Sequence, residues 1–250
     1  MTPDEFSTTW PIHRFDEIDS TNSEARRRAE LGDFGPCWLS AARQSAGRGR
    51  LGRSWDSPAG NLSATALFRV LAKPAEAALA CFSGGLAVID AARAAGVDAS
   101  RLRLKWPNDV LYGEAKLAGV LIETGASPGG LWMAAGFGVN IATAPLRPDR
   151  ATACLAQLPG GASLTAVRYL SLLDIALRAR LAQLVAEGFA STRADWLAHA
   201  AFMGERVELR PSTGRIEGVM RDLAPDGALV LELADGALHH VRAGEISILG

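Results

Sequence analysis

The pattern of the sequence changes after Gly204, and this change limits the folds that the chain can adopt. In the 47 residues from Gly204 to the end, short β-type runs alternate with Pro, Gly and Asp turns. Five short strands in so small a segment predict a small β-barrel. The runs cover residues 206–209, 216–223, 228–233, 238–242 and 246–249.

The preceding part of the chain mixes both kinds of secondary structure. Apolar runs with strand character cover residues 12–18, 37–42, 61–70, 102–104, 110–112, 117–124 and 131–140. Helical spacing predicts helices over residues 21–31, 74–96, 167–184 and 190–202. Thr21 followed by Glu24 is a capping-box pattern for the first of these helices.

We therefore predict an α+β fold in two units, with a boundary near Met203. The larger unit covers residues 1–203 and the smaller one residues 204–250. A piece as small as the second is marginally stable alone, so we expect it to dock on the first.

Charge and cysteine content exclude several classes of protein. The 26 Lys and Arg against 27 Asp and Glu give a net charge of −1, so the chain is not a general binder of nucleic acid or of anionic membranes. Its 3 cysteines form no CxxC pair, which argues against a disulfide framework or a Cys-based zinc site and fits a reducing cytoplasm. We find no secretory signal and no apolar run of about 18 residues that would span a membrane. The 4 histidines lack metal-ligand spacing, so we predict no metal-binding residues.

The most unusual segment covers residues 44–53, where three glycines and three arginines fall within seven positions. Gly47, Gly49 and Gly52 satisfy the dinucleotide-binding pattern GxGxxG, but that motif must open a helix, and the following Ser-Trp-Asp-Ser-Pro cannot continue one. The segment is either a solvated basic loop or an anion cradle, in which backbone N–H groups and arginines bind phosphate or carboxylate. In a chain without net positive charge, we favour the cradle.

Two further groups of polar residues differ from their surroundings. Residues 105–109 (Lys-Trp-Pro-Asn-Asp) combine a cation with two Asx groups, and Lys116 lies at the start of an apolar strand. The ordinary interpretations are a turn packed on its own indole ring and a lysine that extends to solvent. Next to a glycine-containing strand that lets a ligand lie close, Lys116 would instead point at an anion. Gly136 and Gly138 would let a flat ligand approach the backbone, where Asn140 offers an amide.

Five blocks of the sequence, in this order, resemble the biotin protein ligase family, over about residues 12–249. The blocks are Asp19-Ser20-Thr21-Asn22, the segment 44–53, the segment 105–109, the segment 116–123 and Gly136-Phe137-Gly138-Val139-Asn140.

The resemblance implies a fold and a reaction. The fold is a mixed-sheet catalytic domain of the type shared with class II aminoacyl-tRNA synthetases, followed by an SH3-like barrel. In the reaction, the biotin carboxylate attacks the α-phosphate of ATP with Mg²⁺, which gives biotinyl-5'-AMP and pyrophosphate. The ε-amine of a lysine on a carrier then takes the biotinyl group, and the usual carrier is the biotin carboxyl carrier protein of acetyl-CoA carboxylase.

The same resemblance assigns residues to the two substrates. Those implied for biotin, with the first four on its ureido ring, are Ser20, Thr21, Asn22, Gln44, Gly47, Arg48, Gly49, Arg50, Lys116 and Gly119. Those implied for ATP are Arg50, Arg53, Trp55, Lys105, Asn108, Asp109, Lys116 and Asn140.

The implied catalytic residues are Lys116, Arg48 and Arg50. Lys116 would bridge the biotin carboxylate and the α-phosphate, and the two arginines would close over the adenylate on a loop that is mobile when empty. Trp55 would stack on adenine. Asp109 would orient Lys105 or the incoming lysine amine, or hold Mg²⁺ through water.

Two departures from the family pattern change what we expect. The first block begins at Asp19, which leaves no room for the N-terminal DNA-binding module of some members, so we expect a ligase that binds no DNA. Some relatives carry a basic residue after the last strand, near the nucleotide, whereas this chain continues Ile248-Leu249.

The resemblance also allows a homodimer that forms through an exposed sheet edge.

Three alternatives stay open at this point. A lipoate or octanoyl transferase would share the fold, but the Gly/Arg segment together with residues 105–109 favours biotin. A sensor that binds biotin without turnover would not require Arg48, Arg50 and Lys116 together. A structural protein with an incidental basic loop is the third alternative.

Overall fold

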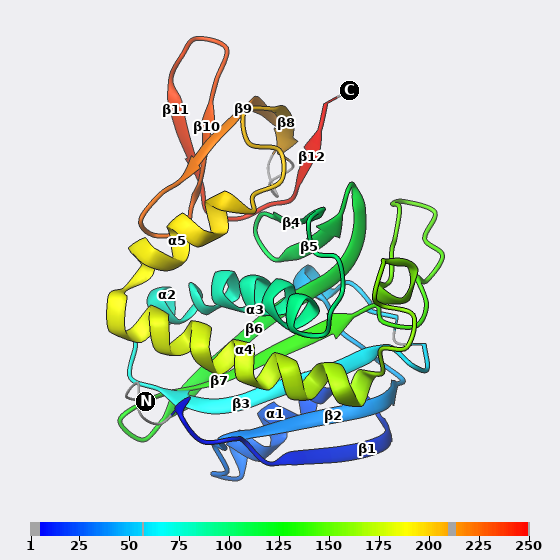
Figure 1. Cartoon of the computed structure of the whole chain (residues 1–250). Helices are drawn as coiled ribbons and strands as arrows, with labels where there is room; N and C mark the ends of the chain where they lie inside the picture. The colour runs from blue at the N-terminus through cyan, green and yellow to red at the C-terminus, as the bar shows by residue number, and fades with distance from the viewer. Residues whose placement is uncertain (1–5, 57, 210–213, 250) are drawn as a thin grey trace.

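The computed structural model describes residues 6–56, 58–209 and 214–249. Seven strands form one mixed sheet: β1 (Ile12–Ile18), β2 (Cys37–Gln44), β3 (Leu62–Val70), β4 (Leu102–Lys105), β5 (Asp109–Tyr112), β6 (Ala115–Ser127) and β7 (Gly130–Val139). Their order across the sheet is β1-β2-β3-β7-β6-β5-β4 (Figure 1). β1 and β2 are parallel and the other neighbours are antiparallel, as expected of an α+β domain.

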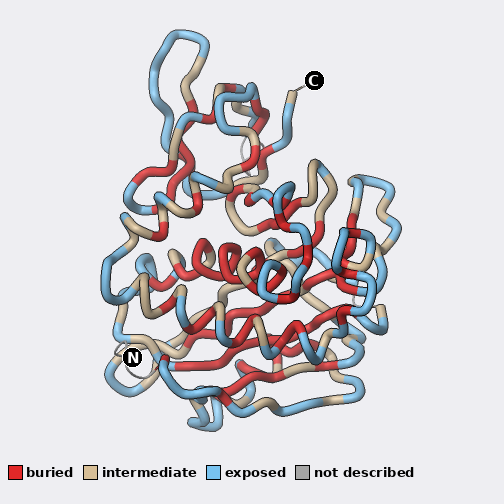
Figure 2. The backbone as a smooth tube through the Cα atoms, viewed as in Figure 1, coloured by how far each residue is buried: buried red, intermediate tan, exposed pale blue. Residues whose placement is uncertain are grey.

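Alternating side chains of the central strands build two cores, one on each face of the sheet. The helices are α1 (Thr21–Glu30), α2 (Pro74–Ala77), α3 (Ala80–Ala94), α4 (Ala166–Glu187) and α5 (Phe189–Ala198). Trp38 and Phe68 belong to the large core with α3 and α4, whereas Leu39 and Leu67 pack with Ala25 of α1. Figure 2 shows the central strands and α3 as the most continuously buried part of the chain. The helix α1 therefore lies on the opposite face from α3 and α4, at the end of the sheet where the first sequence block lies.

The start of α1 differs from the predicted capping box. Ser20, not Thr21, is the N-cap, and its hydroxyl accepts a hydrogen bond from the backbone N–H of Ser23. The hydroxyl of Thr21 is instead used in a tertiary contact with Gln44. Asp19, directly before the cap, accepts two hydrogen bonds of 2.8 Å from the guanidinium of Arg27. This ion pair fixes the segment from which the polar side chains of the site extend.

The Asp19 ion pair predicts a pH-dependent contribution to stability. Hydrogen bonds from Arg27 hold the pKa of Asp19 at about 2, below its ordinary value of 3.8. The contribution is therefore present above about pH 4 and is lost as the pH falls through about 2. We expect Asp19→Asn to lower the melting temperature by about 1–3 °C near pH 6, since exposed pairs contribute little, and by much less near pH 2, where most of the contribution is lost. Asp16→Asn, at an exposed position of β1, is the control; a loss for Asp19→Asn that does not change with pH would contradict this account.

The predicted helix over residues 74–96 is divided in the structure. It forms α2 and α3, separated at Ala78 and Leu79. By length and composition the segment Pro74–Ala94 could cross a membrane, but 67% of its most apolar window is buried inside the structure. That burial is what the central helix of a packed domain shows.

The C-terminal strands form a second sheet, as predicted. They are β8 (Arg206–Leu209), β9 (Ile216–Leu223), β10 (Leu229–Glu232), β11 (Leu238–Val241) and β12 (Ile246–Ile248), in the order β11-β10-β9-β8-β12. This small sheet docks on the larger domain beside α5 and β4 (Figure 1). The indole Nε1 of Trp106 donates a hydrogen bond of 3.1 Å to the carbonyl of Gly227, and Arg193 pairs with Asp222.

Candidate active site

One pocket collects nearly all the predicted site residues. It lies among the N-terminus of α1, the segment after β2, the β4–β5 turn, and β6 and β7. Gly47 does not line the pocket; the predicted residues that do are Ser20, Thr21, Asn22, Gln44, Arg48, Gly49, Arg50, Arg53, Trp55, Lys105, Asn108, Asp109, Lys116, Gly119 and Asn140.

Gly47 has a different role in the structure. A side chain at Gly47 would collide with the backbone carbonyl of Trp55, whose own N–H donates a hydrogen bond of 2.9 Å to the Gly47 carbonyl. The glycine therefore lets the backbone at residue 47 lie close to the backbone at residue 55. It shapes the loop but does not line the pocket.

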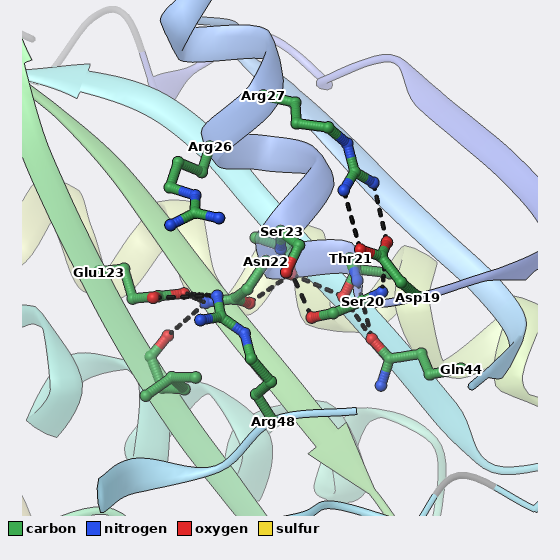
Figure 3. A network of polar contacts seen from close by, with 12 residues as sticks. Asp19, Ser20, Thr21, Asn22, Ser23, Arg26, Arg27, Gln44, Arg48 and Glu123 are labelled. Atoms are coloured by element: carbon green, nitrogen blue, oxygen red, sulfur yellow. Dashed lines mark hydrogen bonds and ion pairs between the residues drawn. The ribbon is translucent and has the colours of Figure 1, made fainter. Parts of the chain in front are cut away.

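Neutral polar side chains form one end of the pocket, where Thr21, Asn22 and Gln44 line it (Figure 3). Together with Thr65, which contacts Thr21 and Asn22, they are called the polar cluster below. Gln44 ends β2, two residues beyond the predicted strand, and its Oε1 accepts hydrogen bonds from the N–H (2.8 Å) and hydroxyl (3.1 Å) of Thr21. The hydroxyl of Thr65, a fully buried residue, lies 2.8 Å from that of Thr21 and 2.6 Å from Oδ1 of Asn22. A rigid group of donors and acceptors with little charge suits a neutral polar ring such as a urea.

The glycines of β7 admit side chains of the protein itself. A Cβ atom at Gly136 would overlap Oδ1 of Asn22, and one at Gly138 would overlap the indole ring of Trp55. We expected a flat ligand against this backbone; in this structure, the close approach is made by Asn22 and Trp55.

Residues 45–53, called the arginine loop below, fold over the pocket. No α-helix follows the glycines: residues Arg50–Gly52 form one 3₁₀ turn, and Arg48 bridges back to Ser54, so the rejected dinucleotide interpretation is also excluded by the structure. Arg48 pairs with Glu123 (2.8 Å) and Arg53 with Glu245 (2.6 Å). Arg50 donates to the side-chain oxygen of Asn108 at 3.2 Å.

Lys116 lies inside the pocket, with only 16% of its side chain exposed, and does not extend to solvent. Its Nζ lies 2.6 Å from Oδ1 of Asp109 and 5.4 Å from the centre of the Trp55 ring. The sequence analysis gave three alternative roles for Asp109: orienting Lys105, orienting the incoming amine, or holding Mg²⁺. In the structure its carboxylate pairs with Lys116, a contact that none of these roles includes. The ring of Trp55 packs between Lys116 and the glycines of β6 and β7.

The side chain of Asn140 supports a neighbouring loop. Its Nδ2 donates to the carbonyl of Ala153 at 3.0 Å, and the residue is 2% exposed. Asn61 holds the same loop, because its Oδ1 accepts hydrogen bonds from the N–H groups of residues 141–143. These two buried amides position the loop that carries Arg147 and Arg150.

Sequence reasoning missed several groups at or beside the pocket. Arg147 and Arg150 line it from the loop after β7, and Glu245 lines it from the C-terminal sheet. Arg147 pairs with Asp56 at 3.0 Å. No local motif marks these positions, since each reaches the pocket only through the tertiary fold. Thr65 of the polar cluster and Glu123, which contacts Asn22, were also missed as site residues, and only Glu123 was part of a recognised block.

Burial and ion pairing shift the pKa of two charged residues of the pocket, Lys105 and Glu245. Burial lowers the pKa of Lys105, although Asp109 and Glu245 oppose the shift. Burial raises the pKa of Glu245, but Arg53 and Lys105 more than offset it and leave the pKa below its usual range.

The charged end of the pocket is built for a polyanion. Seven of its residues are cationic: Arg48, Arg50, Arg53, Lys105, Lys116, Arg147 and Arg150. Its three acidic residues, Asp56, Asp109 and Glu245, each pair with one or more of these cations. The seven cations exceed the three carboxylates by four charges, so a ligand with several phosphate charges can be neutralised by the excess while the carboxylates keep cationic partners. A neutral polar ring and a polyanion could thus be held end to end in one pocket.

The chain is similar to known proteins over nearly its whole length. Residues 18–140 match the model of the "Biotin/lipoate A/B protein ligase family", and residues 202–249 match the "Biotin protein ligase C terminal domain". A protein of Paracoccus denitrificans named "Biotin--[acetyl-CoA-carboxylase] ligase" is 40% identical over 218 residues, which are 85% of this chain and 90% of that protein.

Two further relatives, one of them a solved structure, also match most of this chain. The "Bifunctional ligase/repressor BirA" of Escherichia coli is 34% identical over 235 residues, which are 92% of this chain and 72% of that protein. The solved structure of the biotin protein ligase from Aquifex aeolicus in complex with biotin and ATP has a TM-score of 0.80 and 26% identity, and the match covers 96% of this chain and 98% of that one.

Proposed function

The chain belongs to the biotin protein ligase family, and we propose that it attaches biotin to a lysine of a biotin carboxyl carrier protein through a biotinyl-5'-AMP intermediate. The observation that carries this proposal is the single pocket in which the polar cluster adjoins seven cations. The polar cluster would bind the ureido ring of biotin, and the cations would bind the triphosphate of ATP. The carboxylate at the other end of biotin would then lie near the α-phosphate.

The first step joins two anions, so positioning and charge neutralisation dominate its catalysis. A biotin carboxylate oxygen bonds to the α-phosphorus, the bond from that phosphorus to the β-phosphate oxygen breaks, and pyrophosphate leaves with the electron pair. Lys116 would neutralise both reacting anions, because its Nζ is enclosed and already held by a carboxylate that phosphate oxygens can replace. Arg48 and Arg50 would cover the adenylate from the arginine loop.

Mg²⁺ would arrive with ATP and not at a resident site. Among the described residues, no group of three or more His, Cys, Asp and Glu side chains could hold a metal ion. Mg²⁺ commonly binds nucleotide phosphates with one or two carboxylates, and Asp109 is the acidic residue of the pocket that fits this role. The ion would neutralise charge on the phosphates.

In the second step, the neutral ε-amine of the carrier lysine attacks the acyl carbon of biotinyl-AMP. The bond from that carbon to the phosphate oxygen breaks, AMP leaves, and the amine loses one proton as the amide forms. An arginine loop that stays closed until the carrier arrives would keep water from the intermediate.

The arginine loop predicts leakage of the intermediate in one variant. Arg50 joins the loop to Asn108 on the opposite side of the pocket. We expect Arg50→Gly to release biotinyl-AMP about tenfold faster, as for loss of one hydrogen bond to a charged group, with biotinylation of bystander proteins as the readout. The exposed Arg26→Gly is the control. A variant that retains its intermediate as well as the unmodified protein does would contradict this role.

The proposed function is tested by release of pyrophosphate with biotin and ATP. Release that needs both substrates supports an adenylating enzyme, whereas biotin binding without release indicates a sensor. Release with lipoate or octanoate in place of biotin would indicate an enzyme of the same fold that acts on those acids instead.

Location and assembly are further proposals. The three free cysteines, Cys37, Cys81 and Cys154, are compatible with a reducing cytoplasm. Among the described strands, the outer edge of β1 has no neighbour, which leaves it available to a second copy of the chain.

A further inference from the structure

Glu123 is a charged residue beside the pocket that the reaction described above does not use. It lies on β6, and its two carboxylate oxygens accept hydrogen bonds of 3.0 and 2.8 Å from Nη2 of Arg48. Oε2 also accepts a hydrogen bond of 2.7 Å from Nδ2 of Asn22. Figure 3 shows the carboxylate of Glu123 pointing toward both side chains, one from the arginine loop and one from α1.

These contacts connect the arginine loop to the polar cluster twice. Directly before the loop, the side-chain oxygen of Gln44 accepts hydrogen bonds from Thr21. Farther along, Arg48 is bonded to Glu123, which continues to Asn22 and then to Thr65. Since Thr65 also contacts Thr21, the hydrogen bonds form a closed circuit under the loop. Loss of the Glu123 side chain therefore removes the connection through Arg48 and leaves the connection through Gln44 and Thr21 in place.

Glu123 holds the guanidinium of Arg48 more strongly than a neutral residue would. The Nε of Arg48 is buried and has no hydrogen-bond partner among the described residues, so the side chain depends on its Nη2 contacts. The exposed fractions of the two side chains, 36% and 30%, still allow the pair to open. A charge-assisted bond that is half-accessible suits a loop that must close and reopen in each cycle.

We propose that Glu123 is a positioning residue that keeps the arginine loop closed over biotin through Arg48, and so sets how long biotin and its adenylate stay enclosed. This inference rests on the proposed function. Glu123 acts on the loop and not on the reacting atoms, so its loss changes dissociation of biotin and leaves the KM for ATP unchanged.

The test is a chase of labelled biotin from the full-length protein by excess unlabelled biotin, without ATP. We expect Glu123→Ala to dissociate roughly tenfold faster than the unmodified protein, as for a partly exposed charge-assisted bond. Glu114→Ala, at an exposed position before β6, removes the same charge and should not change the rate. Should Glu123→Ala fold poorly, Glu123→Gln, whose amide oxygen still accepts from Asn22, decides the question with a smaller increase.

A double-variant comparison separates positioning from general loosening. In an Arg48→Ala background, Glu123→Ala should add less than twofold, because its route through Arg48 is already absent. Equal effects in both backgrounds, or an unchanged dissociation rate in Glu123→Gln and Glu123→Ala, would overturn the inference while leaving the proposed function intact. Absence of biotin binding in the unmodified protein would overturn both.

Discussion

Lys116→Ala should slow the formation of biotinyl-AMP by about 10²–10³-fold, the loss expected when a charge that stabilises the transition state is removed. Lys116 is enclosed between Asp109 and the ring of Trp55. Without it, the carboxylate of Asp109 remains in the pocket and repels both reacting anions. The rate is measured as exchange of labelled pyrophosphate into ATP at saturating biotin, so that a change in kcat is separated from a change in KM.

Lys73→Ala is the matched control for Lys116→Ala, because Lys73 is exposed and does not line the pocket. Asp109→Asn in the Lys116→Ala background should recover part of the lost rate, since the uncompensated charge is then removed as well. An adenylation rate in Lys116→Ala equal to that of the Lys73 control would remove Lys116 from the centre of the mechanism.

Gly136→Ala should weaken biotin binding by about a hundredfold, which corresponds to about 2.7 kcal/mol at 25 °C. The new methyl group would overlap Oδ1 of Asn22, a residue only 5% exposed and held by hydrogen bonds. Displacing Asn22 breaks its bonds to Thr65 and Glu123 and leaves the buried Thr65 hydroxyl without this acceptor, a cost of about 1–3 kcal/mol. Biotin affinity is measured by calorimetry.

A double variant identifies the cause of this loss. If the overlap with Asn22 is responsible, Gly136→Ala combined with Asn22→Ala should bind biotin no worse than Asn22→Ala alone. Additive losses would show that the alanine acts in another way, and full affinity in Gly136→Ala would show that Asn22 is not needed in its observed position.

Local sequence patterns predicted the elements and failed mainly at their ends. β1 coincides with the predicted strand-like run over residues 12–18, and the five C-terminal strands fall within the predicted β-type runs between turn residues. Helix capping was wrong by one residue, because Ser20 and Thr21 are both suitable caps and the tertiary contact with Gln44 decides between them. The break between α2 and α3 and the extension of β2 to Gln44 likewise depend on packing that no local pattern contains.

Local sequence patterns do not predict the order of the strands in the sheet. β7 pairs with β3 on one side and β6 on the other, so that segments far apart in sequence meet at the pocket. That pairing brings Asn22 against Gly136 and Trp55 against Gly138.

The sequence predicted residues that the structure brings together at one pocket, but not which of them contact one another. All but one of the residues that the family resemblance implied line the pocket, whereas the ion pairs among its residues were not predicted. Arg48 and Glu123 are 75 positions apart, and Glu245 comes from the other domain. Long-range ion pairs leave no periodic trace in a sequence, because many acidic residues could serve equally well until the fold selects one.

Transfer of biotin to a purified biotin carboxyl carrier domain, with Mg-ATP present or omitted, tests the central claim most directly. We expect transfer that requires ATP, that disappears when the acceptor lysine of the carrier is replaced by arginine, and that releases one pyrophosphate per biotin attached. Tight biotin binding without transfer to the intact carrier would contradict the claim and indicate a sensor.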